Sequence, residues 1–225
     1  MLYFNGIFDG VNRQNVVQSG LQLNLNASNT NSYPKTGTSW FDLSTNNYTA
    51  TLQNYISVPT YDTNNGGSII VNGSPEYIGW PGNYFNFLNF TISVWMKAAS
   101  FTNYQNIIYK GDTTAGQYGI IINTAGNWLV EPAAGFLTNT LVLNTWYYLT
   151  GTYDGTTVTA YNNSANVGTA LAINSVRGIE TTIGTDLPNS RYFNGLIGGA
   201  QIYNRALTSA EVLQNFNATK ARYNV

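Results

Sequence analysis

The chain has 225 residues, of which 43% are hydrophobic and 14% aromatic, enough to bury a sizeable core. Only 8% are charged, with nine basic and ten acidic residues and no basic cluster, so the electrostatic surface of a nucleic-acid or anionic-membrane binder is missing. Cysteine and histidine are absent. Disulfides, thiolate and imidazole metal sites, and Ser-His or Cys-His catalysis are therefore excluded.

The N-terminal stretch, Met1 to Val16, has neither the pattern of a Sec-type leader nor an apolar run long enough to cross a bilayer, so we expect no membrane insertion. It is nevertheless richer in apolar residues than a solvated tail. Two interpretations stay open: an extra edge strand on the chain's own sheets, or an anchoring arm that docks by strand addition. The residues expected to make either contact are Leu2, Tyr3, Phe4, Ile7 and Phe8.

Strand patterns recur along the rest of the chain, with turn residues between them. The clearest is Phe90 to Ala98, where a period of two predicts a strand with one buried face. Two hairpins are predicted, one over Tyr118 to Pro132 and one that turns at Asp154-Gly155. Further strands are expected over Gly20–Leu25, Ser68–Val71, Asn106–Asp112, Glu180–Ile183 and Gly195–Tyr203. Strands without intervening helices favour an antiparallel sandwich.

One good helix signature follows the last strand. Thr208-Ser-Ala-Glu211 is a capping box, in which each of the two end residues can satisfy the other's backbone N–H. Leu207, Val212 and Phe216 give the helix a short apolar face, so it is expected to close the domain. The Gly198-Gly199 pair in the preceding strand predicts a bulge or a close backbone approach.

Several segments resemble the laminin-G-like, concanavalin-A-type jelly-roll domains. IYNRALTSAEV after FNGLIGGAQ is similar to their C-terminal signature, and TWYYLTGTYDGTTVTAYNNSANVG to their central hairpin. VQSGLQLNLNASNTNSYPKTGTSWFDLSTNNYTATLQN and NGGSIIVNGSPEYI resemble the version carried by tailed-bacteriophage structural proteins. The resemblance implies an all-β fold of two antiparallel sheets with one short C-terminal helix. It also implies one domain over residues 17–225 after an arm of residues 1–16.

The resemblance bears on calcium, because related domains often carry acidic residues where this chain has Asn26, Asn72 and Gly198-Gly199. Amides in place of carboxylates remove the charge that drives calcium binding. No cofactor is therefore expected, and a calcium site is disfavoured. The carboxylates that remain are interpreted as turn-stabilising or solvated: Asp42, Asp62, Glu76, Asp112 and Asp154.

Glucanases share this architecture, and retaining glycosidases need two carboxyl groups close together. The chain has no Glu-x-Asp motif, and its closest acidic pair in sequence, Glu180 and Asp186, is expected to be separated by a strand and a turn. Acids distant in sequence can still converge in space. The sequence therefore disfavours a hydrolase without excluding one.

Glycan binding is the stronger alternative, because sugars stack on aromatic rings and bond to amide side chains. Trp80 and Trp128 lie beside turns and are the candidates for exposed stacking platforms, with Tyr84 and Asn127 as neighbours. Ordinary packing stays open for both tryptophans. Core or inter-sheet packing is predicted for Trp40, Trp95 and Trp146.

These observations lead to a non-enzymatic virion structural protein of a tailed phage, with other virion proteins or copies of itself as partners and surface glycans as ligands. The alternative is a carbohydrate-binding adhesion module of a bacterial surface or secreted protein. The expected location is the virion, or the cell exterior under the alternative. A weakly charged polar surface without a leader is consistent with release in a phage particle.

Overall fold

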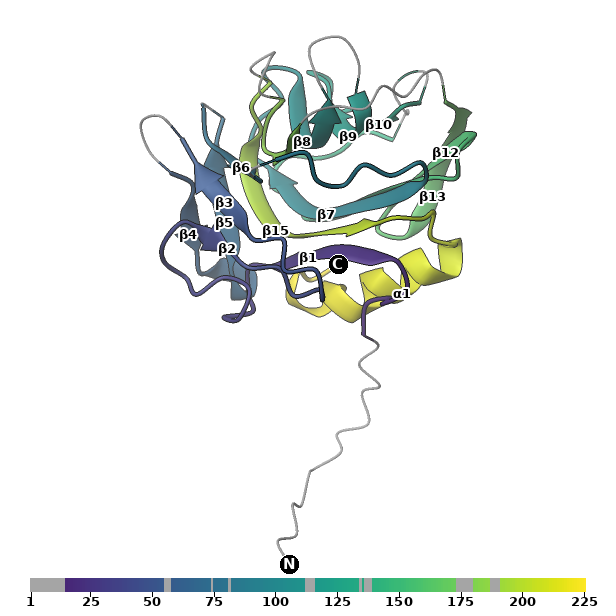
Figure 1. Ribbon diagram of the computed structural model, residues 1–225. Coiled ribbons are helices and arrows are strands. Elements are labelled where there is room, and N and C mark those ends of the chain that lie inside the picture. The colour runs from purple at the N-terminus through teal and green to yellow at the C-terminus, as the bar shows by residue number, and fades with distance from the viewer. Residues whose placement is uncertain are drawn as a thin grey trace, which may run out of the picture.

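The computed structural model describes residues 15–54, 58–73, 75–80, 82–111, 116–133, 135, 139–172, 180–186 and 191–225. Two antiparallel sheets face each other, and one short helix lies beneath them (Figure 1). The first eight strands are β1 (Leu21–Asn26), β2 (Ser39–Trp40), β3 (Ala50–Gln53), β4 (Thr60–Asp62), β5 (Ser68–Asn72), β6 (Tyr77–Gly79), β7 (Phe90–Ala98) and β8 (Gln105–Gly111). The others are β9 (Gly116–Ile122), β10 (Trp128–Glu131), β11 (Tyr147–Tyr153), β12 (Thr157–Asn162), β13 (Ala165–Leu171), β14 (Glu180–Ile183) and β15 (Asn194–Tyr203).

Sheet A has the order β13-β12-β11-β7-β15-β5-β4, and sheet B has the order β10-β9-β8-β14-β6-β3-β2. Strand β15 is the centre of sheet A, because β7 pairs along one of its edges while two strands share the other. Ile197 and the residues before it pair with β5, and Gly199 and the residues after it pair with β1. The predicted fold class, an all-β sandwich with one C-terminal helix, is confirmed.

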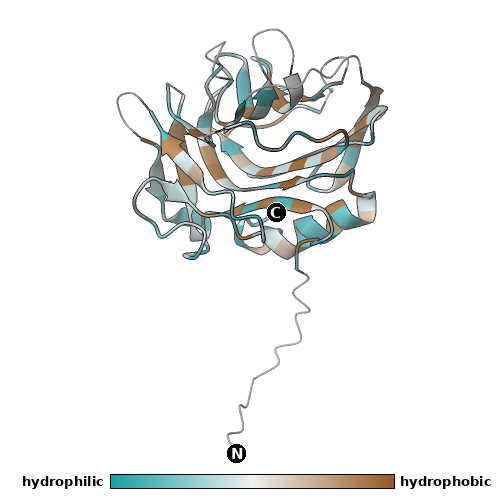
Figure 2. Cartoon of the chain, in the orientation of Figure 1, coloured by the Kyte–Doolittle hydropathy of each residue, from teal (hydrophilic) through white to brown (hydrophobic). Residues whose placement is uncertain are grey.

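The core lies between the two sheets. Hydrophobic and hydrophilic residues alternate along many strands, as Figure 2 shows, so each strand turns its apolar side chains inward. Both predicted hairpins are present: β9 pairs with β10, and β11 pairs with β12 across Asp154-Gly155. Trp40 and Trp128 are among the largest fully buried side chains. The core packing predicted for Trp40 is confirmed. Trp95 and Trp146 are buried as well, but in a separate cluster with Phe216 and Tyr223.

The prediction that β7 has only one buried face is wrong. Its outer face is covered by the C-terminal segment, which comprises α1 (Ser209–Thr219) and the 3-10 turn η2 (Lys220–Arg222). The Trp95 ring stacks on Tyr223 with centroids 3.9 Å apart, and its Nε1 donates to Thr219 Oγ1 at 2.8 Å. Thr91 Oγ1 donates to the Arg205 carbonyl. Packing against the C-terminal segment therefore buries the face of β7 that the period-two pattern predicts to be exposed.

The start of α1 has the predicted capping box. Thr208 Oγ1 accepts from the Glu211 backbone N–H at 3.3 Å, and the Glu211 carboxylate accepts from the Thr208 backbone N–H at 2.9 Å. Arg205 adds a two-pronged ion pair to that carboxylate, at 2.6 and 2.9 Å. Leu207 and Val212 pack in one buried cluster, as a hydrophobic staple requires.

The chain enters the fold beside this helix. The Val17 backbone N–H donates to Asn215 Oδ1 at 2.8 Å, and Tyr203 Oη donates to the Val17 carbonyl at 3.0 Å. The contact residues predicted for the N-terminal arm, Leu2, Tyr3, Phe4, Ile7 and Phe8, lie outside the described residues. The division into residues 1–16 and 17–225 stays a prediction. Within the described ranges, no helix has both the length and the apolarity that crossing a membrane requires.

The Arg205 ion pair makes a testable contribution to acid stability. The hydrogen bond from Arg205 lowers the pKa of Glu211 from 4.5 to about 2. A depressed carboxylate pKa stabilises the fold above the unfolded-state pKa, and this stabilisation is lost as the pH falls from about 4.5 towards 2. Glu211→Gln keeps a side chain that can complete the capping box, so we expect it to cost only about 0.5–1 kcal/mol at neutral pH.

The free energy of unfolding of the variant should fall less than that of the wild type between neutral pH and pH 2–3, as measured by urea denaturation. If the free energies of unfolding of the wild type and the variant fall in parallel with pH, Glu211 does not make this contribution to acid stability.

Candidate functional site

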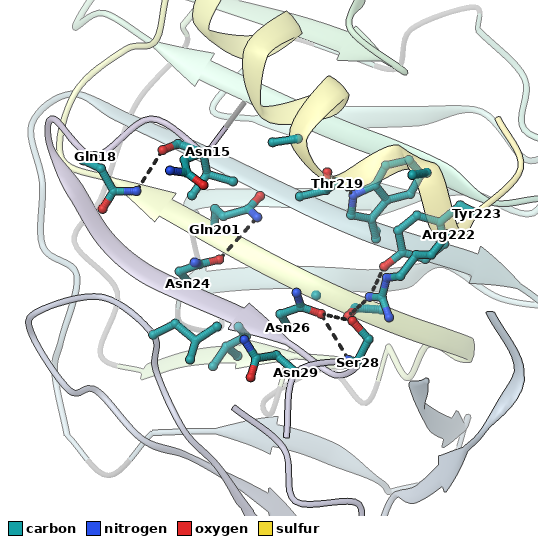
Figure 3. A pocket seen from close by; sticks show the side chains of 18 residues that line it. Asn15, Gln18, Asn24, Asn26, Ser28, Asn29, Gln201, Thr219, Arg222 and Tyr223 are labelled. Carbon is teal, nitrogen blue, oxygen red and sulfur yellow. Dashed lines mark hydrogen bonds between the residues drawn. The ribbon is translucent and has the colours of Figure 1, made fainter. Parts of the chain in front are cut away.

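A pocket of about 450 Å³ lies on the outer side of sheet A, between strands β1 and β15 and the C-terminal segment (Figure 3). Its floor comes from β15 and β1, and its roof from the end of α1 and from η2. The lining residues are Asn15, Val16, Gln18, Asn24, Leu25, Asn26, Ser28, Asn29, Leu43, Trp95, Gly198, Gly199, Gln201, Ala218, Thr219, Ala221, Arg222 and Tyr223. Its volume is within the range of small-molecule sites.

Small residues leave this space open. A Cβ on Gly199 would lie 2.5 Å from the Leu25 carbonyl oxygen of β1, and a Cβ on Gly198 would collide with the Tyr223 hydroxyl. The pairing of β15 with β7 shifts register between Ile197 and Gly199, so Gly198 lies in a bulge. Both predicted outcomes of the Gly-Gly pair, a bulge and a close backbone approach, are confirmed. Ala218 and Ala221 are the small residues on the roof.

Strand β1 presents amide side chains to the pocket because its residues alternate strictly. Its leucines are buried, while Asn24 and Asn26 face outward. The oxygen of each amide is held by a partner: Asn24 Oδ1 accepts from Gln201 Nε2 at 3.4 Å, and Asn26 Oδ1 accepts from the Ser28 backbone N–H at 3.1 Å. Asn29 Oδ1 likewise accepts from the Asn31 backbone N–H.

Because the amide oxygens already accept hydrogen bonds, the N–H groups of these side chains are the part that remains available. The Nδ2 groups of Asn24, Asn26 and Asn29 have no hydrogen-bond partner among the described residues. Figure 3 shows the three side chains along one wall of the pocket. The wall is therefore fixed in orientation and offers N–H donors to a ligand.

Aromatic rings shape the opposite wall but offer no open face. Trp95 is 2% exposed and Tyr223 is 3% exposed, because the two rings stack on each other. Phe216 lies on the Trp95 ring as well, at a centroid distance of 5.8 Å. The rings give the pocket rigidity, and its recognition chemistry comes from the polar side chains.

Arg222 lies at the Ser28 end of the pocket. Its Nη1 donates to the Gly67 carbonyl at 2.7 Å, and its Nη2 donates to the Gly198 carbonyl at 2.5 Å and to the Tyr223 hydroxyl. The guanidinium also lies over the Tyr223 ring, 4.4 Å from its centroid. Every one of these contacts is to a neutral group.

The family described as "Concanavalin A-like lectin/glucanases superfamily" matches residues 72–213, more than half of the chain. The chain belongs to this family. A comparison with curated proteins finds no match. The lectin-like identity predicted from the C-terminal signature and the central hairpin is confirmed at this level, and the phage-specific version is not part of the match.

Solved structures with the same fold include two carbohydrate-active proteins. One is domain 4 of AbnA, an extracellular GH43 arabinanase from Geobacillus stearothermophilus, which was solved with arabinotriose. It has a TM-score of 0.69 and 17% sequence identity, and the match covers 88% of this chain and 99% of the AbnA domain. Trypanosoma rangeli sialidase with the inhibitor DANA has a TM-score of 0.68 at 18% identity and covers 92% of this chain. The lectin-like chain spans only 34% of the sialidase. At these identities the likeness shows the fold alone.

The predicted stacking platforms of this lectin-like domain are not exposed. Trp80 is 3% exposed and Trp128 is fully buried, so the exposure predicted for both rings is wrong. Trp80 donates its Nε1 to the Tyr48 carbonyl at 2.8 Å and packs edge-on against Phe85. A turn next to a tryptophan does not expose the ring when the side chain belongs to the core, as both of these do. The packing alternative holds for both residues.

Tyr84 and Asn127 lie apart from the amide-lined pocket. Tyr84 is 38% exposed and packs on Tyr48, with centroids 4.9 Å apart. Asn127 follows the turn between β9 and β10 and accepts from Thr140 Oγ1 at 2.7 Å. Neither residue lines the pocket, and their role in glycan binding stays a prediction.

The remaining calcium candidates serve as turn and loop anchors where the structure describes them. The Asp42 carboxylate accepts from the backbone N–H groups of Asn24, Ser44 and Tyr48, and Asp154 accepts from Thr156 and Thr157. Asp62 accepts from Asn64, and Glu76 accepts from Asn72. Asp112 lies outside the described residues. In the described ranges no group of three or more acidic side chains could hold a metal ion.

Two carboxylates that are far apart in sequence, Glu131 and Asp186, lie close enough to influence each other electrostatically. Burial raises the pKa of Glu131, and the nearby Asp186 raises it further, while Arg191 lowers it. Asp186 Oδ2 lies 3.7 Å from Arg191 Nε. Glu131 Oε2 is buried and has no hydrogen-bond partner among the described residues. A search for closely spaced acids in the sequence misses this pair, because its members come from β10 and from the loop after β14.

Sheet B also has two smaller hollows on its outer face, of about 360 and 170 Å³. They share Gln53 and Tyr77, whose side chains bond to each other at 2.9 Å. The amide-lined pocket is larger and has more polar side chains around it, so it is the better candidate site of this domain.

Proposed function

We propose that this protein is a non-catalytic glycan-binding module and that the amide-lined pocket holds the sugar. The observation that carries the proposal is the row of Nδ2 donors from Asn24, Asn26 and Asn29, fixed through their oxygens beside an open hollow. Such donors match the hydroxyl and ring oxygens of a saccharide.

The expected affinity of the amide-lined pocket for a sugar is modest. Each neutral hydrogen bond contributes about 0.5–1.5 kcal/mol after water is displaced, and the aromatic rings at this site have no free face for stacking. The rigid amides require little ordering on binding, because their orientation is set before the ligand arrives. A structural neighbour supports the choice of ligand, since domain 4 of AbnA, which has the same fold, was solved with arabinotriose.

A virion role is a finer proposal that rests on composition and on the resemblance to phage structural proteins. The 8% charge content and the abundance of polar neutral residues support work in an extracellular setting. In this setting the pocket would attach a phage particle to surface glycans. An adhesion module of a bacterial surface or secreted protein is the alternative, with the same binding chemistry.

The first prediction from this proposed function concerns the amide donors. Asn24→Asp and Asn29→Asp keep the engaged oxygens but remove one donor each, so each should weaken glycan binding about threefold to tenfold. The measurement is a glycan array followed by calorimetry on the best ligand. Asn31→Asp, with the same charge change on an exposed residue outside the pocket, is the matched control.

If the array shows no ligand, or if the pocket variants bind as well as the control, the glycan-binding proposal is wrong. Melting temperatures of all three variants should stay close to the wild type, because each altered side chain keeps its acceptor.

The second prediction is that the protein releases no reducing ends from β-glucans, arabinans, alginate or agar. The electrostatic coupling of Glu131 to Asp186 makes this a demanding test, because a buried carboxyl with a raised pKa can act as a general acid. Turnover that is lost in Glu131→Gln or Asp186→Asn would show that the module is an enzyme.

The third prediction distinguishes the virion protein from the bacterial adhesion module. Purified particles of a phage that encodes this chain should contain it at a fixed ratio to the major capsid protein, measured by quantitative mass spectrometry. Its absence from particles, with free protein in the medium or on a cell surface, would favour the adhesion module.

A further inference from the structure

The charge of the amide-lined pocket is unbalanced. Of the 18 residues that line it, Arg222 is the only charged one. The ion pairs that the structure describes involve Arg191 and Arg205, and none involves Arg222. Arg222 is therefore a half-buried guanidinium at the pocket wall with no carboxylate partner among the described residues.

Its neighbours do not supply the missing negative charge. The acceptors of Arg222 are two backbone carbonyls and the Tyr223 hydroxyl, and burial raises the pKa of Tyr223, so that phenol stays neutral. The nearby Asp42 does not line the pocket, and its carboxylate is engaged by backbone N–H groups. Some of the guanidinium N–H donors are left without a partner among the described residues.

The side of the pocket formed by β1 and the turn after it adds to the same polarity. The unengaged groups there are the Nδ2 donors of Asn24, Asn26 and Asn29, while the matching oxygens accept hydrogen bonds within the protein. Donor dipoles and a full positive charge therefore face the same space. A ligand rich in acceptors and carrying a negative charge fits this space better than a neutral one.

We propose that the pocket selects acidic saccharides, in which a carboxylate or sulfate group on a sugar residue pairs with Arg222. The inference rests on the proposed glycan-binding function and names its ligand class. The amide donors then bind the hydroxyl and ring oxygens of the same sugar, and Arg222 discriminates charged from neutral glycans.

Arg222 also has a structural role that the test must separate. It ties the 3-10 turn η1 (Asn64–Gly66) and strand β15 together through the Gly67 and Gly198 carbonyls, and its own carbonyl accepts from Asn65 Nδ2. Arg222→Gln and Arg222→Lys both lose this fork of hydrogen bonds, but only lysine keeps the charge. The two variants therefore form a matched pair with similar structural damage and different electrostatics.

The experiment measures binding of paired probes by calorimetry: oligogalacturonide, alginate oligomers and sialyllactose against their methyl esters, and sulfated carrageenan oligomers against the desulfated forms. For at least one pair, the wild type should bind the acidic member at least about tenfold more tightly, and this preference should shrink at high ionic strength. Arg222→Lys should keep a preference and Arg222→Gln should lose it. The carboxylate and sulfate arms show which anionic group is used.

Two results overturn the inference and leave glycan binding intact: equal affinity within every pair while some glycan binds, or a preference that persists in Arg222→Gln. Failure of every glycan, acidic or neutral, overturns the proposed function itself. Melting curves of both variants are recorded first. If either variant is unfolded, the comparison is made on the wild type alone, and equal affinity within every ester pair, or a preference that high salt does not reduce, overturns the inference.

Discussion

The close approach of backbones at Gly198-Gly199 is the constraint on which the pocket side of the molecule depends. It lets β1 reach β15 at the Leu25 carbonyl and lets Tyr223 lie over the bulge. The Gly198 carbonyl, freed from regular pairing, accepts from both the Ala27 backbone N–H and Arg222. One residue without a side chain thus joins the first strand, the last strand and the C-terminal segment, and the hollow between them follows from that junction.

This arrangement explains why the outer face of sheet A is both packed and polar. The Trp95 and Tyr223 rings cover the part of β7 under η2, while the amides of β1 remain beyond the reach of the helix. A helix of 11 residues is too short to cover the whole sheet. The uncovered part of the sheet is lined by amide side chains whose oxygens already accept hydrogen bonds within the protein. Recognition needs a rigid polar surface of this kind.

Much of the fold could be predicted from the sequence because its signals are local. Period-two patterns, the Asp154-Gly155 turn and the capping box at Thr208 each depend on a few adjacent residues. The pocket could not, since it brings residues 24–29 against residues 198–223. The alternating amides of LQLNLN were a usable signal, but they became meaningful only once Gln201 and Ser28 were seen to hold their oxygens. The exposure predicted for Trp80 and Trp128 was wrong, because both side chains belong to the main core cluster and a neighbouring turn does not reveal that direction.

The pairing of β1 with β15 also has a consequence for how the chain acquires its structure. Leu21 to Asn26 pair only with β15 in the described part of the sheet, and Val17 bonds to Asn215. The ribosome makes these partners nearly two hundred residues apart. Strand β1 must therefore wait, with its leucines uncovered, until β15 and the helix after it have been synthesised. Such high contact order slows folding and exposes an unpaired edge to aggregation in the meantime, so completion of the amide-lined pocket is a late step in the folding of this domain.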